Sequence, residues 1–235
     1  MMEKLKQIYE GKAKKLYETA DPDLLIQEFK DDATAFDATK RGTILNKGVI
    51  NNKLSEKLFN LLSKKGVPTH FVKRLNDRDM LVKKVAIVPI EVTIRNIVAG
   101  GMAKMLGLEE GIVLKEPVLE YHYKEDKLHD PLINDYHILA LEIATEKELD
   151  AISKYSFMVN DALKKFFDSK GLILVDFKLE FGRCKGKIIL ADEISPDTCR
   201  LWDKTTKEKL DKDRFRRDLG GVEEAYQEVL RRVME

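Results

Sequence analysis

The segment VDFKLEFG, residues 175–182, carries an acid, a base and an acid at every second position: Asp176, Lys178 and Glu180. Because successive side chains on a β-strand point to opposite faces, this pattern predicts a strand with one charged face. The other face would be apolar and turned toward the core, with Val175, Phe177, Leu179 and Phe181. The charged row is either an ordinary solvated face or part of a reaction site.

A turn after this segment predicts a hairpin. The stretch Cys184–Gly186 suits a three-residue loop whose glycine can take a positive φ. This register places Arg183 opposite Lys187. Asp192 then lies opposite Lys178, and we expect it to join the charged face.

The predicted hairpin would gather three carboxylates, Asp176, Glu180 and Asp192. They repel one another unless a cation joins them, and Lys178 supplies only one positive charge. A magnesium ion would supply the rest, since Mg²⁺ prefers oxygen ligands. A register slip of one residue would remove this arrangement, because it turns every side chain to the other face.

The flanking sequence predicts the elements that position this hairpin. Residues 7–18 have the pattern of strand, glycine turn and strand, and residues 23–31 that of a third strand, which indicates an N-terminal antiparallel sheet. Residues 48–68 place apolar side chains on one helical face, and Gly66 with Pro68 ends that helix.

Further strands are expected at residues 80–85 and 86–96. A long helix begins at a capping box from Thr145 to Glu148 and ends before Gly171. A last helix covers residues 221–234. A sheet-rich first third followed by helices favours an α+β protein with a cleft near residues 84–90.

Composition excludes several classes of function. The 235 residues carry 42 basic and 41 acidic side chains, so the net charge of +1 gives no field suited to nucleic acid or an anionic membrane. The two cysteines suggest no disulfide framework, and the four histidines lack metal-binding spacing. Without an apolar signal core or a long apolar run, the chain is expected to be cytoplasmic.

Seven motifs in order resemble the SAICAR synthetase family of purine biosynthesis. The three strongest are VPIEVTIRNIVAGG, VDFKLEFG and DEISPDTCRLWD. The others are YEGKAKKLYE, NNKLSEKL, HDP and DKDRFRRDLGG, so the resemblance covers nearly the whole chain.

This resemblance implies an ATP-dependent ligase that joins the carboxylate of carboxyaminoimidazole ribonucleotide (CAIR) to L-aspartate. The implied fold is a two-part α+β architecture with ATP in the cleft between residues 1–86 and 87–235. We expect a homodimer, the commonest oligomer. The alternatives are another carboxylate–amine ligase or small-molecule kinase of this fold, and a catalytically silent nucleotide-binding module.

The resemblance also implies a nucleotide site. The turn Gly11, Lys12, Ala13 and Lys14 would cover the ATP phosphates, although it lacks P-loop spacing and could be a solvated lysine turn. The stretch Lys83, Lys84, Val85 and Ala86 would lie along the adenine, or be a simple strand. Lys178 and Asp176 are the implied catalytic residues, and Glu180 and Asp192 the implied magnesium ligands.

The remaining implied residues would bind substrates. Arg95 and Arg200 would hold the CAIR phosphate in a bidentate fork, or form surface salt bridges. Arg214 would receive a carboxylate of aspartate, or lie on a solvated helix face. Where the family usually has Gly-Ser, this chain has Gly100-Gly101, so Gly101 could offer only its backbone amide. Four polar loop residues could be ligand contacts or ordinary turn residues: Asp37, Asp130, Ser195 and Asp197.

Overall fold

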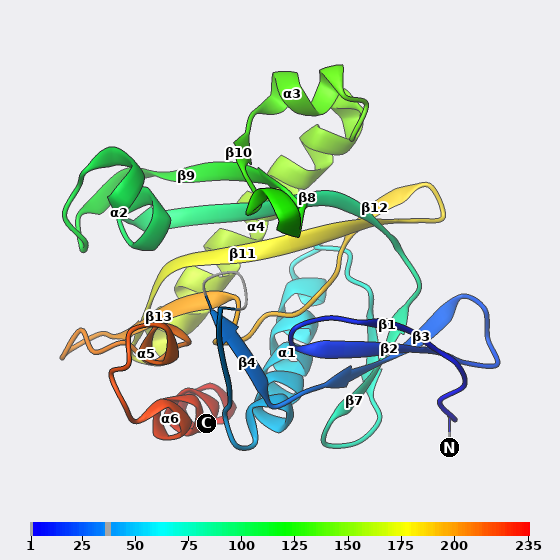
Figure 1. Cartoon of the computed structure of the whole chain (residues 1–235), viewed down its shortest axis with the longest axis horizontal. Helices are drawn as coiled ribbons and strands as arrows, with labels where there is room; N and C mark the ends of the chain where they lie inside the picture. The colour runs from blue at the N-terminus through cyan, green and yellow to red at the C-terminus, as the bar shows by residue number, and fades with distance from the viewer. Residues whose placement is uncertain (1, 36–38) are drawn as a thin grey trace.

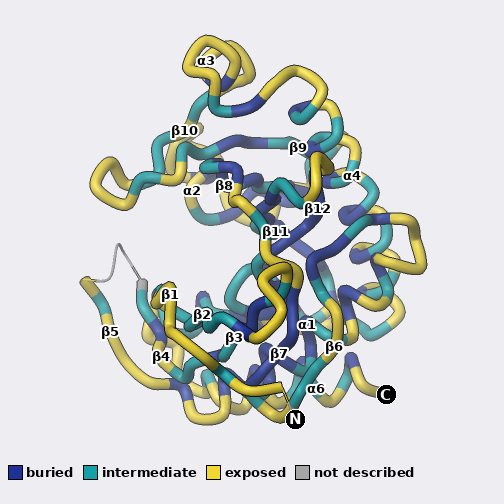
Figure 2. Tube along the Cα trace, turned by 90° about the vertical axis from the view of Figure 1, so that its right-hand side faces the viewer, coloured by how far each residue is buried: buried dark blue, intermediate teal, exposed yellow. Residues whose placement is uncertain are grey.

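The computed structural model describes residues 2–35 and 39–235. It is an α+β fold with a smaller N-terminal sheet and a larger sheet, which lie apart from each other in Figure 1. Buried backbone follows β8, β11 and α1 in Figure 2, whereas β1 and β5 are exposed. No helix in the described part of the chain is long and apolar enough to cross a membrane.

The N-terminal sheet has the strand order β1-β2-β3-β7-β6, with every pair antiparallel. Its strands are β1 (Gln7–Glu10), β2 (Lys14–Glu18), β3 (Leu24–Phe29), β7 (Asp79–Lys83) and β6 (Phe71–Arg74). A separate hairpin joins β4 (Asp32–Ala35) to β5 (Lys40–Thr43). The predicted N-terminal antiparallel sheet is therefore confirmed.

The larger sheet has the order β10-β9-β8-β11-β12, and β13 pairs with β11. Its strands are β8 (Ala86–Ile97), β9 (Val113–Tyr123), β10 (Leu132–Ile133), β11 (Leu172–Cys184), β12 (Lys187–Leu190) and β13 (Cys199–Asp203). The long central strands β8 and β11 pair with each other, so both are flanked on two sides.

Helices cover one face of this sheet and fill the space beside the smaller one. The helix α1 (Lys47–Lys64) packs on β3, β6 and α6 (Val222–Met234), while α4 (Glu146–Ser169) packs on β11. The predicted capping box of α4 is present, with Thr145 and Glu148 each bonding the other's backbone N–H. The shorter helices are α2 (Gly100–Leu106), η1 (Asp126–Leu128), α3 (Asp135–Ala140) and α5 (Asp213–Arg216).

The main hydrophobic core lies between α4 and the larger sheet and continues to α1. From β11 it takes Phe177, Leu179 and Phe181, as the alternating pattern predicted. Val175 is buried, as predicted, but it packs in a separate cluster with Trp202, next to a bulge between Leu174 and Asp176. The charged face of β11 points away from α4.

The predicted hairpin register was also wrong by one residue. Cys184 pairs with Lys187, so the loop has two residues, Lys185 with φ 49° and Gly186 with φ 75°. Two positive φ values suit a type I′ turn, whose twist matches that of the strands better than the longer loop does. Under this register Leu190 pairs with Phe181 rather than with Glu180, and the Glu180 carbonyl accepts the Ala191 N–H, so Asp192 does not lie opposite Lys178 as predicted.

Candidate active site

The charged row of β11 continues across two neighbouring strands. On β8, Glu91 lies opposite Glu180, Thr93 opposite Lys178, and Arg95 opposite Asp176. On β9, Glu120 lies opposite Thr93 and His122 opposite Glu91. Opposed residues share a face of the sheet, so one face of the larger sheet is charged. The other face carries apolar side chains that pack in the core.

Lys178 bridges two carboxylates on this surface. Its Nζ lies 2.8 Å from Glu91 Oε1 and 3.0 Å from Glu180 Oε1, and Lys124 Nζ lies 2.7 Å from Glu180 Oε1. Burial alone would lower the pKa of Lys178, but attraction to Glu180 and Glu91 outweighs burial and raises this pKa well above its ordinary value. Lys178 is therefore a fixed positive charge.

Lys14 connects the N-terminal sheet to the same cluster. Its Nζ forms an ion pair with Asp192 and a second, at 2.9 Å, with Glu193. Asp192 reaches the cluster despite the shifted register, because it follows the end of β12 with φ 62° and so leaves the strand direction. Burial would raise the pKa of Asp192, but Lys14 and Lys178 together lower it, so this carboxylate stays ionised.

Ser195 belongs to the Lys14 cluster. Its Oγ donates to Glu193 Oε2 at 2.6 Å and accepts from the backbone N–H of Asp197. Asp197 is buried and accepts from Lys47 Nζ at 2.7 Å and from Tyr226 Oη at 2.5 Å. These two residues therefore hold the segment after β12 in place.

Arg95 and Arg200 meet at one carboxylate. Asp176 accepts from Arg95 Nη1 at 2.8 Å and from Arg200 Nη1 at 2.7 Å. Each arginine has a second acid: Arg95 Nε lies 2.8 Å from Glu120, and Arg200 Nε lies 2.7 Å from Asp213. The guanidinium groups are therefore fixed in direction by five hydrogen bonds, since Arg200 Nη1 also contacts the second oxygen of Asp176 at 2.9 Å.

The remaining nitrogen of each arginine faces Gly100-Gly101, the first two residues of α2. A Cβ added at Gly100 would lie 2.5 Å from Arg200 Nη2, and one added at Gly101 would lie 3.7 Å from Arg95 Nη2. Neither Nη2 has a hydrogen-bond partner within the described residues, and neither is fully buried. Two cationic N–H groups beside the start of a helix can bind a phosphate.

The expected nucleotide residues form a turn between β1 and β2 and the connection between β7 and β8. The backbone N–H of Gly11 donates to Lys14 O at 2.8 Å, and Lys12 Nζ reaches across the chain to Asp126 at 2.9 Å. Ala13 O accepts from Lys30 N. The turn thus lies close enough to the larger sheet to contact the segment after β9.

Residues 83–86 connect the two sheets and are held by both backbone and side-chain contacts. Lys83 Nζ donates to Thr69 O at 3.1 Å, and the Lys84 N–H donates to Asp23 O. Val85 lies against Gly182, where an added Cβ would come within 2.6 Å of its side chain. Ala86 pairs with Arg183 at the start of β8.

The side chains of two other expected site residues, Asp130 and Arg214, hydrogen-bond to nearby backbone. Asp130 accepts the Glu125 N–H at 2.9 Å and shapes its own loop. Arg214 donates to the carbonyls of Gly220 and Lys209, so its guanidinium is used within its own segment. Asp37 lies outside the described residues.

The carboxylates fit a divalent cation in part. The contacts around Lys178 and Lys14 set four carboxylates, Glu91, Glu180, Asp192 and Glu193, against three ammonium groups. An added cation would offset the excess negative charge. In residues 2–35 and 39–235, three or more metal-binding side chains do not gather closely enough to hold an ion alone. Phosphate and water oxygens would have to complete the shell, as they commonly do for Mg²⁺.

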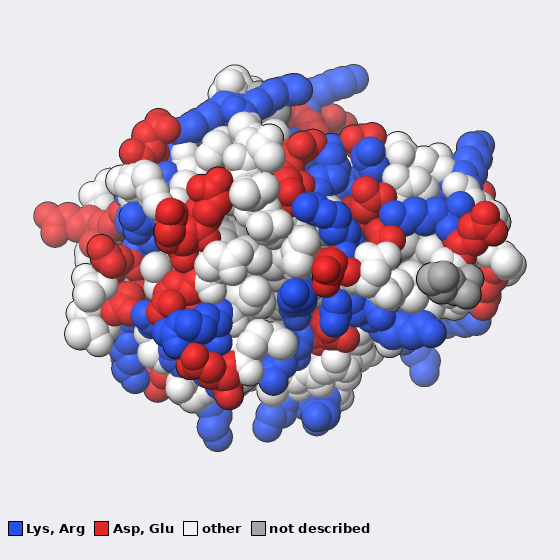
Figure 3. Space-filling model, turned by 90° about the horizontal axis from the view of Figure 1, so that it is seen from below, with Lys and Arg blue, Asp and Glu red and all other residues white. Residues whose placement is uncertain are grey.

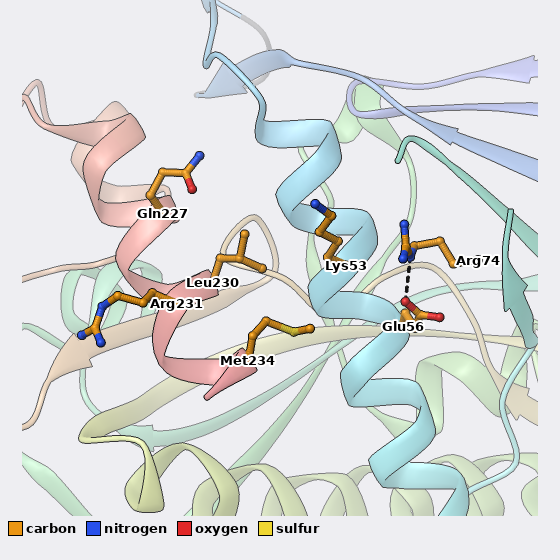
Figure 4. A pocket seen from close by; sticks show the side chains of 7 residues that line it. All are labelled: Lys53, Glu56, Arg74, Gln227, Leu230, Arg231 and Met234. Atoms are coloured by element: carbon orange, nitrogen blue, oxygen red, sulfur yellow. Dashed lines mark hydrogen bonds and ion pairs between the residues drawn. The ribbon is translucent and has the colours of Figure 1, made fainter. Parts of the chain in front are cut away.

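A separate hollow lies between α1 and α6 and has none of these residues. It measures about 370 Å³ and is lined by side chains that include Lys53, Arg74 and Met234 (Figure 4). Arg74 pairs there with Glu56 at 2.7 Å. On the face shown in Figure 3, acidic and basic side chains are interspersed, as expected from a net charge near zero. Neither feature resembles a site for the predicted chemistry.

The sequence did not indicate several charged residues that complete the site. Glu91 alternates with apolar residues on β8, as the predicted Arg95 does, and this signal could have placed Glu91 on one face with the row of β11. Lys124, Glu193 and Asp213 carry no such signal, because only the tertiary structure brings them to Glu180, Lys14 and Arg200.

Comparisons with known proteins agree with this fold and charge pattern. The sequence profile described as SAICAR synthetase matches residues 7–233. The chain is 63% identical over 234 residues to the phosphoribosylaminoimidazole-succinocarboxamide synthase of Caldanaerobacter subterraneus subsp. tengcongensis, covering 100% of both chains.

Solved structures superpose on nearly all of the chain. The enzyme of the same name from Ehrlichia chaffeensis matches with a TM-score of 0.96 and 46% identity, covering 97% of this chain and 98% of that one. A SAICAR synthetase in complex with ADP matches with a TM-score of 0.93 and 51% identity, covering 96% of each.

The charged face of the larger sheet, together with these relatives, defines an α+β ligase of nucleotide metabolism. The chain belongs to the SAICAR synthetase family. Its activity is that of a phosphoribosylaminoimidazole-succinocarboxamide synthase, a step of purine biosynthesis.

Proposed function

We propose that the protein activates the carboxylate of CAIR as an acyl phosphate, using ATP, and that the amine of L-aspartate then displaces phosphate to give SAICAR. The observation that carries this proposal is the pairing of Arg95 and Arg200 beside the two glycines that begin α2, on the same sheet face as Lys178. An anion site and a cluster of lysines side by side suit a phosphorylated substrate and a transferring phosphoryl group.

In the proposed binding mode the CAIR phosphate lies on the Nη2 groups of Arg95 and Arg200. The backbone amide of Gly101 supplies the contact that a serine hydroxyl gives in most of the family. The CAIR carboxylate would then point along the sheet face toward Lys178.

ATP would lie under the turn at residues 11–14, with its adenine along residues 83–86. The ADP complex of the relative that is 51% identical supports an adenine nucleotide here. Lys12 and Lys14 are the cations nearest this turn. Lys12 would exchange its exposed partner Asp126 for a phosphate oxygen, an exchange that costs little because exposed ion pairs are weak.

Phosphoryl transfer depends on positioning and charge neutralisation. A CAIR carboxylate oxygen attacks the γ-phosphorus, the bond to the ADP oxygen breaks, and ADP leaves. The aspartate nitrogen then attacks the acyl carbon, loses a proton, and inorganic phosphate leaves. Lys178 would offset the charge of the carboxylate and phosphoryl oxygens.

Glu180 and Asp192 are the residues proposed to hold Mg²⁺, which neutralises phosphate charge when bound. Asp176 is proposed to act through the two arginines that it joins. Homodimer formation, a cytoplasmic location and a domain division at residue 86 also stay proposals.

An ADP-release assay tests the proposed reaction. The protein would be given ATP, Mg²⁺ and CAIR with each of a panel of amino acids. ADP release that requires both CAIR and L-aspartate supports the proposal. Release with CAIR and alanine at the same rate would contradict the choice of amine, and release with CAIR alone at the full rate would indicate a kinase.

A further inference from the structure

We propose that Asp213 and Glu120 are positioning residues that aim Arg200 and Arg95 at the substrate phosphate. This inference rests on the proposed role of the two arginines. Neither acid contacts Gly100 or Gly101 in the described structure; each acts through one arginine.

The geometry of the guanidinium groups supports this role. A guanidinium is planar, so hydrogen bonds to two of its nitrogens fix the direction of the third. In Arg200, Nε is held by Asp213 and Nη1 by Asp176, and Nη2 is left facing Gly100. In Arg95, Nε is held by Glu120 and Nη1 by Asp176, and Nη2 is left on the side of Gly101.

Both acids are themselves fixed. Asp213 is 1% exposed, and its second oxygen accepts from Arg216 Nη1 at 2.7 Å. Glu120 is 8% exposed and lies 3.4 Å from His122 Nε2. Each acid therefore has two partners, and neither acid can turn without losing its contact with one of them.

The two acids also reduce the cost of bringing two arginines together. Asp176 alone faces two positive charges, and Asp213 and Glu120 bring the count to three carboxylates around two guanidinium groups. The arginines can thus lie side by side before the phosphate binds. A preorganised pair loses less entropy when it captures the phosphate than a mobile pair would.

The test uses Asp213→Asn, Arg200→Lys and the double variant in the full-length protein. An asparagine in place of Asp213 must turn its NH₂ group toward either Arg200 or Arg216, so one guanidinium loses its partner. We measure the KM for CAIR, ATP and L-aspartate, and the inhibition constant of ribose 5-phosphate as a probe of the phosphate site.

The expected result is specific to the phosphate. Asp213→Asn should raise the KM for CAIR and the inhibition constant of ribose 5-phosphate about tenfold, with the other two KM values within about twofold. In the Arg200→Lys background, which already lacks the fork, Asp213→Asn should add less than about twofold. The control is Asp203→Asn, which removes from β13 an acid that pairs with Arg232 of α6. It should change none of the three KM values.

Two outcomes overturn the inference. One is full additivity of Asp213→Asn and Arg200→Lys, which would show that Asp213 does not act through Arg200. The other is an equal rise of all three KM values, which would indicate a general structural role. If Asp213→Asn does not fold, the same cycle with Glu120→Gln and Arg95→Lys decides the question. An unchanged KM for CAIR in Arg200→Lys would instead overturn the proposed phosphate site itself.

Discussion

Glu91 and Glu180 lie directly opposite each other on β8 and β11, and the ammonium group of Lys178 contacts both carboxylates. Like charges at opposed positions destabilise a sheet unless a counter-charge joins them. Lys178 supplies that charge before substrate binds, and an incoming phosphoryl group would compete with the two acids for it. The pair of acids thereby keeps the lysine oriented and ionised.

Replacing Lys178 with methionine should abolish catalysis without unfolding the protein. We expect kcat to fall at least about a hundredfold, as for removal of a group that stabilises transition-state charge. SAICAR formation and thermal unfolding measure the two effects. The matched control is Lys185→Met, which removes a surface lysine paired with Asp23 and should retain full activity. Activity of Lys178→Met close to that of the control would exclude the proposed role.

The two glycines at the start of α2 predict opposite results for two neighbouring substitutions. Gly101→Ser should be tolerated and should leave the KM for CAIR unchanged or lower, because the added Cβ has ordinary clearance from Arg95. Gly100→Ser should raise this KM, since Gly100 has φ +54° and its Cβ would meet the Arg200 guanidinium at 2.5 Å. Steady-state kinetics with CAIR separate the two. Equal effects of both substitutions would contradict the proposed phosphate position.

Glu180→Gln and Asp192→Asn test the proposed metal ligands. Each should weaken binding of Mg²⁺–ATP, measured by calorimetry, while binding of ATP without divalent metal changes little. The physical reason is that an amide is a poorer ligand than a carboxylate for a hard cation. Wild-type affinity for Mg²⁺–ATP in both variants would remove these residues from the metal site.

Asp211 predicts a pH dependence of stability. It is fully buried, and burial together with the nearby charge of Asp213 raises its pKa from 3.8 to about 7. The unfolded chain loses this proton from about pH 4 upward, whereas the folded protein retains it until about pH 7. This group therefore destabilises the fold increasingly as pH rises through that window, by up to about 1.4 kcal/mol per pH unit.

The comparison with Asp211→Asn isolates this effect, because the other acids titrate alike in both proteins. We expect the free energy of unfolding of the wild type, relative to the variant, to decrease between pH 5 and pH 7 in urea titrations. A constant difference over that range would show that Asp211 is already ionised in the fold.

The sequence predicted the charged face of β11 correctly because alternation is a local property of one strand. It could not predict which acids lie across from that face, since Glu91 and Glu180 are joined only by the pairing of distant strands. The hairpin register failed for a related reason: Lys185-Gly186 supports both a two-residue and a longer loop. Asp192 reached the predicted cluster through its own positive φ, which the sequence pattern did not indicate.

The structure divides the residues that were expected to bind substrate into two groups. Arg95 and Arg200 were brought together, whereas Asp197 and Arg214 bond mainly to the protein itself. Motifs indicate that a residue matters to a family. They do not indicate whether its side chain faces a ligand or supports the loop that does.

The central claim, that the CAIR carboxylate is the phosphoryl acceptor, is tested most directly by oxygen labelling. CAIR with ¹⁸O in its carboxylate would be converted with unlabelled ATP and L-aspartate in unlabelled water, and the inorganic phosphate analysed by mass spectrometry. An acyl phosphate transfers a carboxylate oxygen, so the account predicts one ¹⁸O atom in the phosphate for each SAICAR formed. Unlabelled phosphate would show that water cleaves ATP and would contradict the account.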